Sequence, residues 1–190
     1  MREWMIAKLL AWLIALPVVS RDKAELPEAR EIRLQVVAIA IVDASAGNHY
    51  LAAAVAVQGR EESLYGLDWG SCHCLVEKGE CDHGKAHGYW QWHKLPSETK
   101  ADHDGLCSVS DEATQIAAAR AASWLKGCAG GDRDCLAGKY SRLGGLSSLA
   151  APEWAFDRAD KAAALAETIS PAARKKELRK SKKKLPISNS

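Results

Sequence analysis

The segment from Cys81 to His93, CDHGKAHGYWQWH, holds one cysteine, three histidines, three aromatic residues and two glycines. Histidine and cysteine side chains are the ligands that zinc prefers in structural sites. Aromatic side chains beside a glutamine are instead typical of a sugar-binding cleft, because sugar C–H faces pack on aromatic rings and an amide both donates and accepts hydrogen bonds. The segment is therefore consistent with either a metal site or one wall of a glycan cleft.

The zinc alternative draws its ligands from the cysteines and histidines between Cys72 and His93. The candidates are Cys72, His73, Cys74, Cys81, His83, His87 and His93. Their spacing matches no closed zinc motif, because a single residue separates Cys72 from Cys74 and there is no C-x-x-C pair. We expect no metal and no other cofactor. A zinc-dependent nucleic-acid module, using this cluster and the basic C-terminus, is a less favoured alternative.

Two glutamates, Glu61 and Glu62, end an apolar segment and are followed by Ser63. A carboxyl group at the inner end of a helix, half covered by aromatic side chains, is desolvated; desolvation disfavours the charged form, so such a group can act as an acid near neutral pH. Cleavage of a glycosidic bond needs an acid of this kind. The alternative is that both glutamates are exposed at a helix end.

Three short segments follow one another along the chain: ESLY at Glu62–Tyr65, GYWQ at Gly88–Gln91, and AGKYSRLGG around Tyr140. A Glu-Ser pair with an aromatic residue two positions later, a Gly-x-Met-Gln segment and a final Ala-Tyr-Asn-x-Gly segment form the signature of the lysozyme-like superfamily. The chain resembles that superfamily, and within it the lytic transglycosylases and related phage or secreted muramidases. Two positions depart from the signature, since Trp90 replaces methionine and Ser141 replaces asparagine.

The resemblance implies an enzyme that cleaves the MurNAc-GlcNAc glycosidic bond of peptidoglycan, with glycan strands as its partner and no cofactor. Glu62 would be the catalytic acid and then the base. The implied substrate-binding residues are Ser63, Gln91, Tyr140, Trp90 and Trp92, the tryptophans stacking on the sugar or shaping the cleft. In the family the substrate's N-acetyl group assists the reaction, so a lytic transglycosylase is expected. A non-catalytic virion, structural or glycan-binding protein of the same fold is the alternative.

The elements that must position these residues are expected to be mainly helices. Alanine-rich and apolar stretches predict helices at about 27–42, 49–63, 110–124 and 152–169. We expect a mainly α, lysozyme-like (α+β) domain at 28–150 with a loop-rich, cysteine-containing cleft region, a C-terminal helix at 151–170 and a basic tail at 171–190. Residues 1–27 predict a signal-like segment or an amphipathic helix, with a buried core helix as the alternative.

All six cysteines lie between Cys72 and Cys135. An even number of cysteines within one loop-rich stretch predicts disulfides, at least two of them, although the sequence does not show the pairing. Disulfides indicate an extracytoplasmic protein, whether periplasmic, secreted or virion-associated.

The net charge of +2 hides an asymmetry between the tail and the body of the chain. From Pro171 to Ser190 there are eight lysines and arginines and one acidic residue, Glu177, which gives the tail a net charge of +7. The rest of the chain carries 18 basic and 23 acidic residues, a net charge of −5. The tail therefore predicts contact with an anionic envelope or membrane, or else a solvated, frayed terminus; no specific nucleic acid is expected.

Deletion of residues 171–190 should weaken binding to liposomes of anionic lipid and spare cleavage of small soluble glycan fragments. Because the contact is electrostatic, added salt should weaken the binding of the full chain as well. Co-sedimentation with vesicles at low and high salt measures the effect. Equal loss of activity on the soluble fragments would show that the tail belongs to the catalytic unit.

Overall fold

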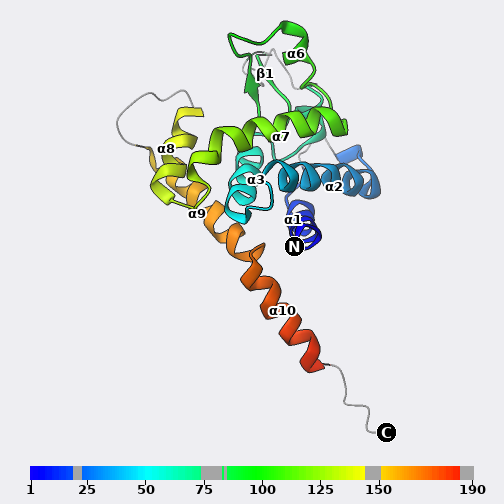
Figure 1. The fold of residues 1–190 in the computed structure, drawn as a ribbon. Coiled ribbons are helices and arrows are strands. Elements are labelled where there is room, and N and C mark those ends of the chain that lie inside the picture. Colours follow the sequence, from blue (N-terminus) through cyan, green and yellow to red (C-terminus); the bar gives the residue numbers. More distant parts are fainter. Residues whose placement is uncertain (19–22, 74–82, 84, 144–150, 185–190) are drawn as a thin grey trace.

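The computed structural model describes residues 1–18, 23–73, 83, 85–143 and 151–184, and these residues are mainly helical, as expected (Figure 1). The longer helices are α1 (Arg2–Ile14), α2 (Pro27–Ala44), α3 (His49–Ser63), α7 (Asp111–Leu125), α8 (Arg133–Leu143), α9 (Glu153–Thr168) and α10 (Pro171–Lys184). The short elements are α4 (Leu67–Gly70), α6 (Lys100–Asp104), the 3₁₀ turn η3 (Lys126–Cys128) and the strands β1 (Ala86–His87) and β2 (Trp92–His93). The two strands pair antiparallel, with Ala86 opposite His93.

Helix α3 is the core of the molecule. Every side chain from Leu51 to Gln58 is buried, as expected of a helix that is apolar on all sides. Helices α2, α7 and α9 pack around it, and its alanines and valines let these neighbours come close. The helix begins at Asn48, whose side chain accepts a hydrogen bond from the backbone N–H of Leu51 at 3.0 Å. It ends at Leu64, which adopts a left-handed conformation with φ 52°.

The N-terminal segment forms a core helix in this structure. Met5, Leu9 and Leu13 of α1 are fully buried, and α1 packs against α2. The guanidinium of Arg30 on α2 donates hydrogen bonds to the carbonyls of Ile14 at 3.1 Å and Leu16 at 3.0 Å. A cation placed there satisfies carbonyls at the end of α1 that have no partner within the helix. No helix of the described residues is long and apolar enough to cross a membrane.

The C-terminal part continues the helical body and then leaves it. Helix α9 packs against both α3 and α8, so it belongs to the same core as the expected 28–150 domain. Pro171 ends this helix and starts the next, because proline suits the first position of a helix. Residues 171–184 form α10, which continues from α9 and points outward from the body (Figure 1). The ammonium of Lys8 on α1 donates a hydrogen bond to the carboxylate of Glu177 on α10 at 2.5 Å. Lysine and arginine favour helix, and this part of the tail is helical rather than frayed.

The prediction of at least two disulfides is confirmed. Cys72, just after α4, is bonded to Cys107, just after α6, and Cys128 is bonded to Cys135 at the start of α8. All four described cysteines are therefore paired, as is common in an oxidising compartment. Cys74 and Cys81 lie outside the described residues.

Gly59, in the last turns of α3, faces the ring of Tyr65. A Cβ at this position would lie 2.5 Å from the Cζ and hydroxyl oxygen of Tyr65. That ring is buried, and its hydroxyl donates a hydrogen bond to the carbonyl of Ala56 at 2.8 Å. The ring therefore has little room to move, which explains why glycine stands in the middle of a helix.

Gly59→Ala should lower the free energy of unfolding by about 1–3 kcal/mol, the usual cost of overpacking a core. Gly138→Ala is the matched control, because Gly138 lies in α8 with no atom within 4 Å of a new Cβ. There alanine should stabilise by about 0.5–1 kcal/mol through helix propensity. Urea unfolding measures both, and a gain at Gly59 equal to that at Gly138 would contradict the packing argument.

Candidate functional site

The first two motif segments meet at the end of α3. The hydroxyl of Ser63 donates a hydrogen bond to the carbonyl oxygen of Tyr89 at 2.7 Å and accepts one from the backbone N–H of Tyr65 at 3.1 Å. The indole N–H of Trp90 donates to the carbonyl of Val55 at 2.9 Å. The Gly-Tyr-Trp-Gln segment is thus joined to the Glu-Ser turn through Ser63 and to the middle of α3 through Trp90, in both cases by a buried side-chain-to-backbone hydrogen bond.

The third segment meets the same helix near its middle. The hydroxyl of Tyr140, on α8, donates a hydrogen bond to the carbonyl of Ala54 at 3.0 Å. Burial raises the pKa of this hydroxyl, while the nearby charges of Arg158 and Glu61 act on it in opposite directions. Tyr140 therefore keeps its proton near neutral pH and remains a donor to the helix.

Most of the expected substrate-binding side chains lie in the core. Trp90 is 1% exposed and Tyr140 0% exposed, and Ser63 and Trp92 are also buried. The ring of Trp90 meets that of Tyr65 edge to face, with centroids 5.6 Å apart. These residues shape the end of α3 by packing, and none of them offers an open ring face for a sugar in this structure.

Gln91 is the expected substrate-binding residue that remains partly exposed. It lies in the turn between β1 and β2 with φ 49°, and its side-chain amide donates a hydrogen bond to the carbonyl of Gly88 at 2.7 Å. Gly88 has φ 71°, and a Cβ there would lie 2.9 Å from the carbonyl oxygen of Leu106. Only glycine fits that position without strain, so the turn that presents Gln91 depends on it.

The two glutamates are paired with cations that the sequence analysis did not identify. Glu62 is partly exposed, and its Oε1 accepts a hydrogen bond from the guanidinium of Arg158 at 2.6 Å. Glu61 accepts one from the ammonium of Lys161 at 3.2 Å. Both cations come from α9, three positions apart and therefore on one face of that helix. The guanidinium of Arg158 also lies 4.8 Å from the ring centroid of Trp154, which is 38% exposed.

Two histidines stack beside the Cys72–Cys107 disulfide. The rings of His87 and His103 are nearly parallel, with centroids 4.0 Å apart. Nδ1 of His87 lies 3.1 Å from the carbonyl oxygen of His103, and Nε2 of His103 lies 3.1 Å from that of Lys85. Because a carbonyl oxygen only accepts, each of these nitrogens carries the ring proton.

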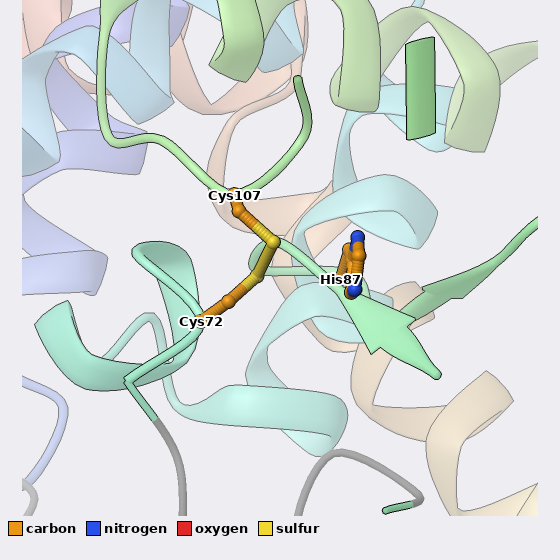
Figure 2. A group of neighbouring side chains, drawn as sticks. All are labelled: Cys72, His87 and Cys107. Atoms are coloured by element: carbon orange, nitrogen blue, oxygen red, sulfur yellow. A yellow bond between two sulfur atoms is a disulfide. The ribbon is translucent and has the colours of Figure 1, made fainter. Parts of the chain in front are cut away.

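The described residues hold one group of the kind that could bind a metal. It consists of Cys72, His87 and Cys107, whose possible ligand atoms lie within 4.8 Å of one another (Figure 2). The two sulfurs are bonded to each other in this state, so neither is a thiolate, the form in which cysteine binds zinc. His83 and His93 lie on the exposed surface, and Cys74 and Cys81 are outside the described residues.

The comparisons with known proteins add no assignment. No protein-family model, no curated protein and no solved structure matches the chain. The site is therefore judged by its own geometry.

The stability of the chain should fall as the pH drops below about 6.5, in part through His103. Burial lowers the pKa of His103 from its ordinary value of 6.5, with neighbouring Lys85 and Glu98 raising it and His87 and Arg120 lowering it. The unfolded chain then binds a proton that the folded chain does not, so acid favours unfolding from that value down through the folded pKa.

His103→Gln should reduce this pH dependence, since glutamine keeps a donor for the carbonyl of Lys85 and does not titrate. Urea unfolding between pH 4.5 and pH 7.5, roughly the range in which histidine changes charge, measures the slope. His93→Gln, on the exposed side of β2, is the control and should leave the slope as in the parent chain. An unchanged slope in His103→Gln would contradict the assignment.

Proposed function

We propose that the protein is a peptidoglycan-cleaving enzyme of lysozyme-like fold, a lytic transglycosylase acting on the MurNAc-GlcNAc bond with Glu62 as its catalytic residue. The observation that carries the proposal is the 2.7 Å hydrogen bond from Ser63 to the carbonyl of Tyr89. It joins two of the three motif segments, and Tyr140 brings the third to the same helix. Three short motifs matched by chance would not be expected all to contact the same helix, two of them at its end and the third in its middle.

The chemistry assigned to Glu62 follows from its place. It lies in the last turn of α3, partly exposed, between the buried Ser63 and the charged α9. As an acid it would protonate the bridging oxygen of the glycosidic bond, and as a base it would then take a proton from the sugar. Arg158 can only donate hydrogen bonds, so its contact with Oε1 has to open when that oxygen carries the proton. Gln91, partly exposed in the turn after β1, would bind an N-acetyl or hydroxyl group.

The setting proposed for this activity is extracytoplasmic, with glycan strands as the partner. The two disulfides support an oxidising compartment. The basic helix α10 extends from the body (Figure 1), where its lysines and arginines can reach an anionic envelope or membrane without disturbing the core.

A second candidate function is a non-catalytic glycan-binding or structural protein of the same fold. One observation favours it: each of the two glutamates is paired with a cation from α9. Paired carboxylates of this kind often serve stability alone. Purified peptidoglycan distinguishes the two candidates, because the non-catalytic protein would bind it and release no fragments.

Glu62→Gln should lower cleavage of peptidoglycan by at least about a hundredfold, the lower end of what general acid–base catalysis contributes. Glutamine keeps the shape and an oxygen acceptor for Arg158, so the fold should remain. Release of soluble fragments from purified peptidoglycan measures the activity, and circular dichroism checks the fold. Glu61→Gln is the matched control and should retain most of the activity; near-normal cleavage by the Glu62 variant would show that this assignment is wrong.

The product should carry a 1,6-anhydro-muramic end rather than a reducing end. Hydrolysis by either usual route needs a second carboxylate across the scissile bond. After Glu62 the next carboxylates are Asp68, just before the cysteines, and then Glu77, Glu80 and Asp82, which lie outside the described residues. None of the four belongs to a recognisable second motif, so the N-acetyl group of the substrate is expected to take the place of the second carboxylate. Mass spectrometry of the digest decides, because the anhydro product is lighter by one water. A reducing end would make Asp68 the next residue to replace.

A further inference from the structure

The group formed by Cys72, His87 and Cys107 brings together three residues of metal-binding types from three separate segments of the chain. Cys72 follows α4, His87 ends β1 and Cys107 follows α6. All three side chains are half-buried, and their possible ligand atoms lie within 4.8 Å of one another (Figure 2). The disulfide accounts for the closeness of the two sulfurs, but it does not require an imidazole at the same place.

The imidazole of His87 is held in place, and its tautomer is defined, by its contacts with His103. Its Nδ1 proton points to the carbonyl oxygen of His103 at 3.1 Å, and the ring stacks on that of His103. In the neutral ring Nε2 is then the nitrogen with the lone pair. A backbone carbonyl that accepts the proton of the other ring nitrogen is the usual second-shell partner of a zinc-bound histidine.

The spacing of the cysteines also suits a metal once the disulfide is opened. The Cα atoms of Cys72 and Cys107 are 5.1 Å apart. Two thiolates on a tetrahedral zinc, each with a Zn–S bond of about 2.3 Å, stand about 3.8 Å apart. Reduction lets the two sulfurs separate to that distance by side-chain rotation and small backbone shifts.

One member of the group, His87, lines a hollow of about 560 Å³ on the surface. A metal ion can therefore approach the group from the side of His87. Two cysteines and one histidine leave the fourth position of a tetrahedral zinc for water or an exchangeable ligand.

We propose that the reduced chain binds one Zn²⁺ through Cys72, Cys107 and His87, so that a metal replaces the disulfide as the link between α4 and α6. A dithiol reductant opens the bond: two electrons and two protons go to the two sulfurs, and the reductant becomes a disulfide. Binding of Zn²⁺ then displaces both thiol protons to solvent. The disulfide and the metal are alternatives at one place, and this site is independent of the activity proposed for Glu62.

The experiment uses the full chain with Cys74→Ser and Cys81→Ser, which removes the two cysteines outside the described residues. The protein is reduced with a phosphine, freed of reductant without oxygen, and titrated with Co²⁺ and then Zn²⁺. We expect one Co²⁺ per chain, with a thiolate-to-cobalt band in the near ultraviolet and the visible bands of a tetrahedral ion, and displacement by one Zn²⁺. The same chain left oxidised should show neither band.

Two sets of variants test the ligands. His87→Gln retains both cysteines, so the disulfide and the fold can be checked in the oxidised state, and it should weaken Zn²⁺ binding at least tenfold after reduction. Cys128→Ser with Cys135→Ser removes the other disulfide, which lies in no such group among the described residues, and should leave the cobalt spectrum unchanged. Absence of a stoichiometric cobalt band, survival of the band in Cys72→Ser, or unchanged affinity in His87→Gln would each overturn the proposal.

Discussion

The burial of α3 is the constraint on which the rest of the structure depends. A helix with small apolar residues on every side can be surrounded completely by other elements. Because its side chains are short and apolar, polar groups of its neighbours can form hydrogen bonds only with its backbone. Here three consecutive carbonyls in the middle of the helix, those of Ala54, Val55 and Ala56, accept hydrogen bonds from Tyr140, Trp90 and Tyr65. Each donor is a large aromatic side chain with one polar atom, so it fills core volume and satisfies its donor at the same time. The helix thereby fixes the position of segments that lie far apart in the sequence.

A buried ion pair adds a second connection between the same parts. The guanidinium of Arg33, on α2, lies 2.7 Å from the carboxylate of Glu25, and both side chains are almost fully buried. Arg33 also donates hydrogen bonds to the carbonyl of Tyr65 at 2.6 Å and to the hydroxyl of Tyr89 at 3.2 Å. A buried charge is tolerated when it has a counter-ion and its remaining donors have acceptors. Here two of the acceptors belong to Tyr65, in the turn after α3, and Tyr89, in the turn before β2. The two motif segments at the end of α3 are thus held by Arg33 as well as by Ser63.

The helices were predictable from sequence, because their signals are local. Ser110 accepts a hydrogen bond from the backbone N–H of Ala113, as an N-cap should, and Pro27 begins α2. The contacts of the buried tyrosines and tryptophans were harder to predict from the sequence. Amphipathic aromatic residues next to a glutamine fit both a cleft and a core, and only the packing around α3 distinguishes them.

The partners of the glutamates and of Arg33 could not be read from the chain. Glu62 meets Arg158 across 96 positions, and Arg33 meets Tyr65 across 32. The chain has many charged residues, and no rule of sequence spacing predicts which of them pair over such separations. That at least two disulfides form was predictable, but their pairing was not, since the bond between Cys72 and Cys107 depends on where the segments after α4 and α6 come together.

The dependence of the glutamates on α9 has a consequence for biosynthesis. A ribosome makes the chain from its N-terminus at about 5–20 residues per second, so α3 exists before either of its cationic partners, Arg158 and Lys161, has been added. During that interval Glu62 lacks Arg158, and Glu61 lacks Lys161 but already has Arg60 of α3 beside it. The side of α3 that α9 will cover is still apolar and uncovered. A nascent chain that stops short of α9 would carry a complete set of motif segments on an incomplete core. The core around α3 can therefore be completed only after α9 has been synthesised.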